Sequence, residues 1–252
     1  MPRGPALVLL ALSVHCRRAQ SRPEPPAPEV LALAPIAEPH ITAAQVAVRA
    51  APREAARWLV LSDAFVAHAR ARSDPSYYTQ AREAADRALA LDPDNASARL
   101  TSAMVMLSEH RFADVVRAAE DLTRRAPGDW RAWALLGDGQ SELGRYREAV
   151  ASYQKLLDLQ PGLSAYSRVG WLRWVSGDPE GALEMMQLAV DSGSDEPEAL
   201  AWAQVDLGRT YFMTGRLDPA ERAFATALEQ LPEYSPAWIG RARVLGAHGK
   251  RA

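Results

Sequence analysis

The chain has 252 residues, of which 48% are hydrophobic and 24% are charged, a balance that excludes a disordered or collagen-like chain. Its 29 Lys and Arg residues nearly balance its 31 Asp and Glu residues, and the net charge of -2 disfavours binding to a nucleic-acid backbone. A single cysteine, Cys16, excludes an intrachain disulfide framework and a cysteine-rich metal site.

The first 53 residues differ in composition from the rest of the chain. An apolar run at residues 6–14, preceded by Arg3, is too short to span a bilayer and is typical of a secretory signal, which we expect at residues 1–21. Residues 22–39 contain six prolines, so residues 22–53 are expected to form a Pro-rich linker with a short helix. The folded domain is then expected at residues 54–252.

These features predict an exported protein, periplasmic or secreted. Cys16 lies where a lipoprotein cysteine would, although His15 stands where a lipidation motif has a small residue. A membrane-anchored lipoprotein is therefore an alternative, with membrane contact only if Cys16 is lipidated. Arginine supplies 27 of the 29 basic residues, a usage that suits a GC-rich, bacterial genome.

From residue 55 onward the sequence repeats with a period of about 34 residues. The clearest copy, residues 130–162, contains Trp133, Leu136, Gly137, Gly144, Tyr146, Ala149, Tyr153 and Pro161. Further copies are expected at residues 55–95, 96–129, 163–200 and 201–234, with a half copy at 235–252. The first copy has about seven extra residues at 71–77, and a longer loop is expected at 193–198.

Small residues recur at the eighth position of the first helix in each copy. They are Ser62, Ala103, Gly137, Gly170, Gly208 and Ala242. Two helices that pack closely need small side chains at the crossing point, so we expect each copy to be a tight helix pair. The expected facing residues of the second helix are Ala81, Val115, Ala149, Ala182 and Ala220. Gly144, Gly177 and Gly215 are expected to end the first helices.

This pattern resembles the tetratricopeptide-repeat family over residues 55–252. The resemblance implies an all-α, right-handed solenoid of antiparallel helix pairs whose first helices line a concave face. It also implies a non-enzymatic scaffold that binds a protein or peptide through that groove, without a small-molecule substrate.

The positions that face the groove in this family form a mostly apolar, aromatic patch here. They include Met104, Leu107, Trp171, Trp174, Trp202, Arg209, Phe212 and Met213. Exposed clusters of this kind are typical of binding surfaces. Alternatively, these rings pack on one another, on the loop near Gly193 or on the N-terminal segment. The basic clamp by which some relatives hold acidic C-termini is absent, because only Arg209 is basic at its positions. A different set of aromatic residues is expected in the core, namely Trp58, Trp133, Tyr166 and Trp238.

No catalytic residue, metal site or cofactor is predicted. The five histidines form no His-Glu-x-x-His motif, and none pairs with Cys16 at a zinc spacing. The half copy is expected to leave Ile239, Val244 and Leu245 facing solvent on one side, so either a partner covers that end or the repeats continue. Two alternative functions follow: a lipid-anchored assembly factor of an envelope machine, or the regulatory part of a larger enzyme.

Overall fold

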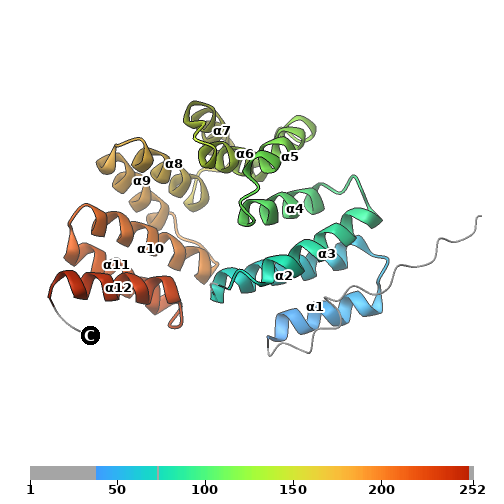
Figure 1. Cartoon of the computed structure of the whole chain (residues 1–252), viewed down its shortest axis with the longest axis horizontal. Helices are drawn as coiled ribbons and strands as arrows, with labels where there is room; N and C mark the ends of the chain where they lie inside the picture. The colour runs from blue at the N-terminus through green and yellow to red at the C-terminus, as the bar shows by residue number, and fades with distance from the viewer. Residues whose placement is uncertain (1–37, 73, 250–252) are drawn as a thin grey trace, which may run out of the picture.

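The computed structural model describes residues 38–249 apart from residue 73, and in these residues the chain forms twelve α-helices and no strand (Figure 1). The all-α repeat fold is therefore confirmed. The expected signal at 1–21, Cys16 and most of the expected linker lie outside the described residues. The helices are α1 Pro39–Ala50, α2 Ala55–Arg72, α3 Tyr77–Leu91, α4 Ala96–Ser108, α5 Phe112–Arg125, α6 Trp130–Glu142, α7 Tyr146–Leu159, α8 Leu163–Val175, α9 Pro179–Asp191, α10 Pro197–Met213, α11 Leu217–Gln230 and α12 Ser235–Ala247.

Helices α2 to α11 form five consecutive pairs that curve around a common centre, with α4, α6, α8 and α10 on the inner side (Figure 1). The curvature brings the end of α2 close to the turn before α12. There the guanidinium of Arg72 lies 2.7 Å from the carboxylate of Glu233. The two ends of the array therefore meet.

The pairs pack closely where the sequence predicts small residues. A Cβ atom added at Gly137 would collide with the ring of Tyr153, and one added at Gly208 would lie 2.8 Å from the ring of Phe224. In the first pair, the hydroxyl of Ser62 donates to the carbonyl of Ala81 at 2.6 Å. All five expected facing residues, Ala81, Val115, Ala149, Ala182 and Ala220, are fully buried.

The last helix departs from this arrangement. Ala242 is exposed, and Gly240 makes the close contact instead, because a Cβ there would collide with the ring of Phe224 in the preceding helix. The expected core position of Trp238 is wrong, since 52% of this residue is exposed. The expected exposure of Val244 is also wrong, since it is fully buried against α11, whereas Ile239 is 54% exposed. Both differences arise because α12 packs on α11 and has no helix after it among the described residues.

Helix α1 packs on the first pair. Ile41, Ala44 and Val48 lie on one face of α1, are at most 4% exposed, and belong to the same apolar cluster as Leu61 and Phe65 of α2. The short helix expected within the linker region is thus part of the packed structure. Its apolar residues recur every three or four positions, which is the spacing of a helix face that needs a partner.

Extra residues in two of the repeats lengthen helices. The insertion near residues 71–77 extends α2 to 18 residues, and the residues expected as a long loop near 193–198 contribute a first turn to α10, which has 17 residues. The loop before α10, residues 192–196, has five residues and is still longer than the three- or four-residue connections between the other described helices, as the sequence predicts. Pro197 begins α10, in the first-turn position where proline leaves no helix hydrogen bond unmade.

A tryptophan hydrogen bond recurs at the start of α2, α6 and α12. The indole Nε1 of Trp58, Trp133 and Trp238 donates to the carbonyl of the proline six residues earlier, at 2.8, 2.9 and 2.8 Å. These prolines lie in the turn before each helix. The bond therefore ties the first turn of each helix to the loop before it, even at Trp238, which is largely exposed.

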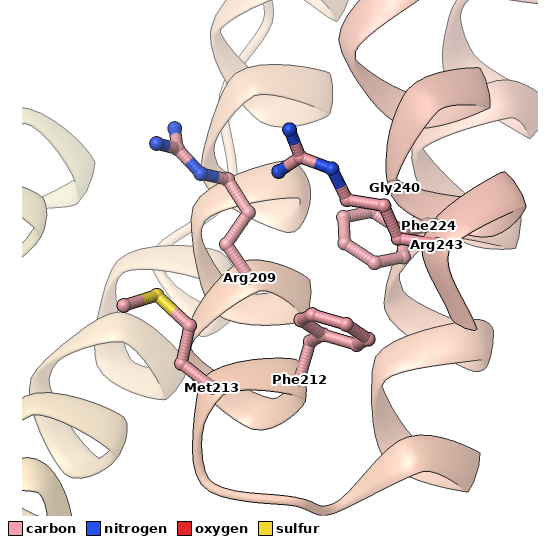
Figure 2. A pocket seen from close by; sticks show the side chains of 6 residues that line it. All are labelled: Arg209, Phe212, Met213, Phe224, Gly240 and Arg243. Atoms are coloured by element: carbon pink, nitrogen blue, oxygen red, sulfur yellow. The ribbon is translucent and has the colours of Figure 1, made fainter. Parts of the chain in front are cut away.

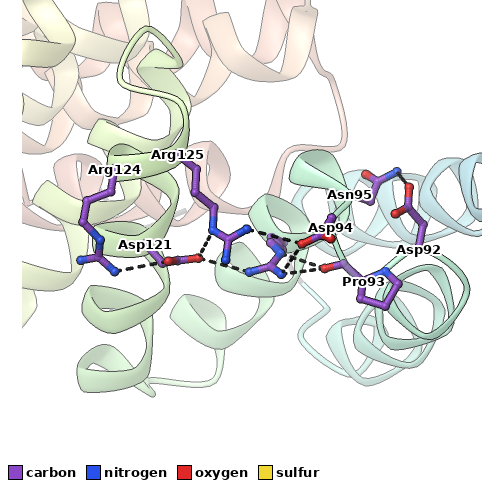
Figure 3. A network of polar contacts seen from close by, with 8 residues as sticks. Asp92, Pro93, Asp94, Asn95, Asp121, Arg124 and Arg125 are labelled. Atoms are coloured by element: carbon purple, nitrogen blue, oxygen red, sulfur yellow. Dashed lines mark hydrogen bonds and ion pairs between the residues drawn. The ribbon is translucent and has the colours of Figure 1, made fainter.

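A polar network holds the turn between α3 and α4 against α5 (Figure 3). Arg99 donates to the carbonyl of Pro93 at 2.7 Å and to Asp121 at 3.2 Å, and Asp121 also accepts from Arg125. Asn95 caps α4 by accepting from the backbone of Ala98 at 3.0 Å. Such partly exposed pairs contribute little individually, so we assign this network to orienting the turn.

None of the described helices combines the length and the apolar composition needed to cross a membrane.

We predict that Gly137→Ala destabilises the domain by about 1–3 kcal/mol, because the added methyl group must displace the ring of Tyr153. The matched control is Gly128→Ala, at a turn position where no atom lies within 4 Å of the new Cβ. Urea unfolding followed by circular dichroism measures both variants. Equal midpoints for the two variants would contradict the close-approach role of Gly137.

Candidate functional site

A hollow of about 360 Å³ lies on the inner face, across α4, α6, α8 and α10. Residues of the turn after α4 and of the second helices α5 and α7 complete its wall. Its lining residues are Leu107, His110, Phe112, Asp138, Ser141, Glu142, Tyr153, Ser167, Arg168, Trp171, Trp202, Asp206 and Arg209. The lining is mixed in polarity, so the patch predicted as apolar surrounds a polar floor.

Two exposed tryptophans contribute the largest aromatic rings of this hollow. Trp171 on α8 is 44% exposed and Trp202 on α10 is 37% exposed. Leu107 and Arg209, which the sequence also places in the groove, line the same hollow. Large aromatic residues that remain open to solvent on a curved inner face are typical of a binding surface.

The remaining predicted groove residues fall elsewhere. Phe212 and Met213 line a second hollow of about 260 Å³ between α10, α11 and α12, together with Arg209, Phe224, Gly240 and Arg243 (Figure 2). Figure 2 shows Phe212 directed toward Phe224 and Arg243, and Met213 directed away from them.

Met104 and Trp174 line neither hollow. The sulfur of Met104 accepts from Arg70 at 3.3 Å, and the side chain packs against the apolar clusters of the first two pairs. Trp174 is partly buried. The structure therefore brings four of the eight predicted groove residues into the larger hollow and divides the rest between the smaller hollow and packed positions.

The floor of the larger hollow is an ion pair that joins three helices. Asp138 of α6 accepts from Arg168 of α8 at 2.8 and 3.0 Å, and from the hydroxyl of Tyr153 of α7 at 2.9 Å. Burial, together with the neighbouring charge of Asp138, raises the pKa of Tyr153 well above its usual value. Arg168 also donates to Ser164 one turn earlier on α8. The network is fully bonded internally and holds the floor rigid.

The negative charge of Asp206 is less completely paired than that of Asp138. Its side chain is 16% exposed, and its partner is the exposed guanidinium of Arg209 at 3.1 Å. Burial raises the pKa of Asp206 to about 6, and the charge and hydrogen bond of Arg209 offset only part of that effect. A buried carboxylate with such a pKa in a cleft is a common feature of binding and catalytic sites.

Ser167 adds an unpaired polar group to the same wall. It is 1% exposed, and within the described part of the chain its hydroxyl has no hydrogen-bond partner. A buried hydroxyl without a partner costs free energy, so this wall carries a polar group that the protein itself leaves unsatisfied.

His110 occupies an unusual backbone position at the rim. Its φ is +58°, the left-handed region that Gly144 occupies after α6 and Gly215 after α10. The ring packs edge-on against Phe112, with centroids 5.5 Å apart. A histidine in a position that usually needs glycine is strained, and such strain is concentrated at functional sites.

Sequence reasoning missed Asp206 and His110, and it placed Ser167 on the concave face without predicting that its hydroxyl is buried. His110 had a signal, because it replaces the glycine that ends the first helix in three other repeats. The burial of Asp206 and Ser167 had no signal in the sequence, since only the packing of neighbouring helices shows it.

The fold is that of a helical-repeat protein, a class that suggests a protein-interaction scaffold. Residues 78–139 and 135–197 each match a family described as tetratricopeptide repeat, and the chain belongs to that family.

Curated relatives share only part of their length with this chain. Tetratricopeptide repeat protein 33 of Mus musculus is 37% identical over 84 residues, which cover 33% of this chain and 32% of the relative. Human tetratricopeptide repeat protein 13 is 34% identical over 98 residues, 39% of this chain and 11% of the relative. The chain thus spans a third or less of these relatives.

Solved structures with low sequence identity share the fold. A thermophilic TPR protein of Thermus thermophilus matches with a TM-score of 0.67 and 21% identity, covering 76% of this chain and 98% of that one. A chain of the Cut9–Hcn1 APC/C hetero-tetramer matches with a TM-score of 0.65 and 19% identity, covering 81% and 39%.

We predict that Asp206→Asn stabilises the domain at neutral pH. The folded-state pKa of about 6 exceeds the ordinary value of 3.8, so ionisation costs the folded state free energy as pH rises from about 4 to about 6. Ionisation of Asp206 is therefore expected to lower the free energy of unfolding by about 2–3 kcal/mol above pH 6 and by almost nothing below pH 4. Urea unfolding of the parent and the variant across this pH range measures the difference.

The control is Asp195→Asn, in the exposed loop before α10. If the stability difference between the parent and Asp206→Asn does not change with pH, the Asp206 carboxylate is not buried as described.

Proposed function

We propose that this chain is a non-enzymatic scaffold that binds a protein or peptide segment in the larger hollow of its inner face. Tetratricopeptide repeats indicate a protein-interaction role, and proteins built from them are typically non-enzymatic scaffolds. The observation that supports this location is the joint presence of exposed Trp171 and Trp202, buried Asp206 and unpaired Ser167 in one hollow.

The side chains of the hollow indicate the chemistry of the bound segment. Trp171 and Trp202 offer apolar ring surface to an aliphatic or aromatic side chain, which gains free energy by leaving water. Leu107 extends that surface on the α4 side. The segment therefore anchors by an apolar side chain, as the sequence predicts.

A cationic group completes this ligand. Asp138 is already paired with Arg168, whereas Asp206 has the single contact with the exposed Arg209. A Lys or Arg side chain, or an N-terminal amine, placed beside Asp206 stabilises its ionised form. We therefore propose a segment in which an apolar residue lies close to a basic one.

Export remains part of the proposal, on the basis of the apolar run at residues 6–14 and the flanking arginines. Expression of the full chain in a bacterial host, followed by fractionation and N-terminal sequencing, tests it. A product cleaved after residue 21 in the periplasm supports export, and label from a fatty-acid analogue that is lost in Cys16→Ser identifies lipidation instead. An uncleaved, unlabelled chain in the cytoplasm contradicts both.

We predict that Trp171→Ala and Trp202→Ala each weaken binding of a selected peptide by at least about tenfold, because aromatic anchors dominate interface energies. Selection from a displayed random-peptide library against the full chain supplies the probe, and fluorescence anisotropy measures its affinity. Tyr146→Ala is the matched control, since Tyr146 is 41% exposed but lies on α7 and outside the hollow. A loss of affinity in Tyr146→Ala equal to that in the tryptophan variants would contradict the location.

We also predict that the affinity of a basic peptide falls by up to about tenfold per pH unit below pH 6. Protonation of Asp206, whose pKa in the free protein is about 6, removes the charge that the peptide contacts. The same titration with Asp206→Asn separates this effect from protonation of other groups, and the variant is expected to show weak, pH-independent binding. A pH profile that is unchanged in the variant would exclude Asp206 as the contact.

A further inference from the structure

A second cluster of potential ligand groups lies away from the hollow, where α1 meets α2. Glu38 precedes α1, His40 lies in its first turn and His68 is near the end of α2. One ligand atom from each of the three side chains lies within 4.8 Å of the other two. We propose that these residues bind a divalent transition-metal ion, with Zn²⁺ as the reference ion.

The spacing of the three side chains fits a metal better than direct hydrogen bonding. The Nδ1 atoms of His40 and His68 lie 3.9 and 3.7 Å from the two oxygens of Glu38, beyond hydrogen-bond length. Ligand atoms around a tetrahedral Zn²⁺ are about 3.4 Å apart, given bond lengths near 2.0–2.1 Å. Small side-chain rotations therefore bring all three atoms to the ion.

The chemistry of the three groups selects among ions. Two imidazole nitrogens and one carboxylate suit Zn²⁺, Co²⁺ or Ni²⁺, whereas Ca²⁺ and Mg²⁺ prefer oxygen ligands. Three protein ligands leave the fourth position of Zn²⁺ for water. We assign the ion a structural role, because it would join α1 to the first repeat.

The surroundings hold one ligand fixed and leave another accessible. The side chain of His68 is 8% exposed, and its ring packs edge-on against Tyr77 with centroids 4.4 Å apart. The side chain of His40 is 50% exposed, which gives the ion a route from solvent. A buried, oriented imidazole facing an open one is the arrangement expected of a preformed site.

Arg72 competes with the ion for Glu38. Its Nη2 lies 3.2 Å from Oε1 of Glu38, while its Nη1 lies 2.7 Å from Glu233. Arg72 is thus able to keep its contact with Glu233 when Glu38 turns toward the ion. Sequence analysis predicts no metal site because His40 and His68 are distant in sequence and follow no known spacing; only the packing of α1 on α2 brings them together.

The test uses the full chain without a polyhistidine tag and carrying Cys16→Ser, which removes an unrelated soft ligand. Calorimetric titration with ZnCl₂ and the visible absorption of bound Co²⁺ are the measurements. We expect one ion per chain and no detectable heat from Mg²⁺ or Ca²⁺. His40→Ala and Glu38→Gln are each expected to weaken Zn²⁺ binding by at least about tenfold. Tenfold is the lower end of the loss caused by removing a residue that only supports a metal ligand, so removing a ligand itself should cost at least as much.

His248→Ala is the matched control, because His248 lies near Asp218 on α11, far along the chain from this cluster. Circular dichroism checks that each variant folds. His40 is substituted and His68 is not, because replacing the exposed His40 is less disruptive to the packing than replacing the buried His68. The proposal is overturned if the chain binds no Zn²⁺, if Mg²⁺ binds as tightly, or if His40→Ala and Glu38→Gln bind like His248→Ala.

Discussion

The structure depends on how closely the two helices of each pair approach one another. At Gly137, Gly170 and Gly208, the neighbouring helix occupies the space that a side chain would need. This contact fixes the rotation of each first helix about its own axis. Since helical side chains point in directions set by that rotation, the same contact decides which residues face the inner surface. The small residues at the back of each inner helix therefore determine the composition of the hollow at its front.

The hollow combines a fully hydrogen-bonded floor with polar groups at its edges that are incompletely paired. Asp138, Arg168 and Tyr153 satisfy one another across three helices, so this network resists rearrangement. Asp206 and Ser167 lie close to it but lack equivalent partners. A site built in this way keeps its shape while leaving the Asp206 carboxylate for a ligand to pair with. The exposed tryptophans add apolar surface beside these groups, which favours a segment with both apolar and polar contacts.

The repeat pattern predicts most of the fold, because it records local helix spacing and close-packing positions that do not depend on distant parts of the chain. It fails where the repeat is interrupted. Extra residues lengthen α2 and α10 because they have helical sequences, and Trp238 is exposed because no helix follows α12 among the described residues. Of the site, the pattern predicts Trp171 and Trp202, which occupy regular positions. It does not predict the burial of Asp206, which depends on how neighbouring helices pack around α10.

The meeting of Arg72 and Glu233 has a consequence for the spacing of the two ends of the array. Both side chains are largely exposed, so water and salt screen their attraction and the pair stabilises the contact only weakly. The ends of the array therefore separate at small energetic cost. In a repeat array each repeat contacts only its neighbours, so a change in the overall curvature is distributed as small changes over many inter-repeat contacts. Because salt screens this contact, the spacing of the two ends of the array is expected to depend on ionic strength, while the contacts within each helix pair stay unchanged.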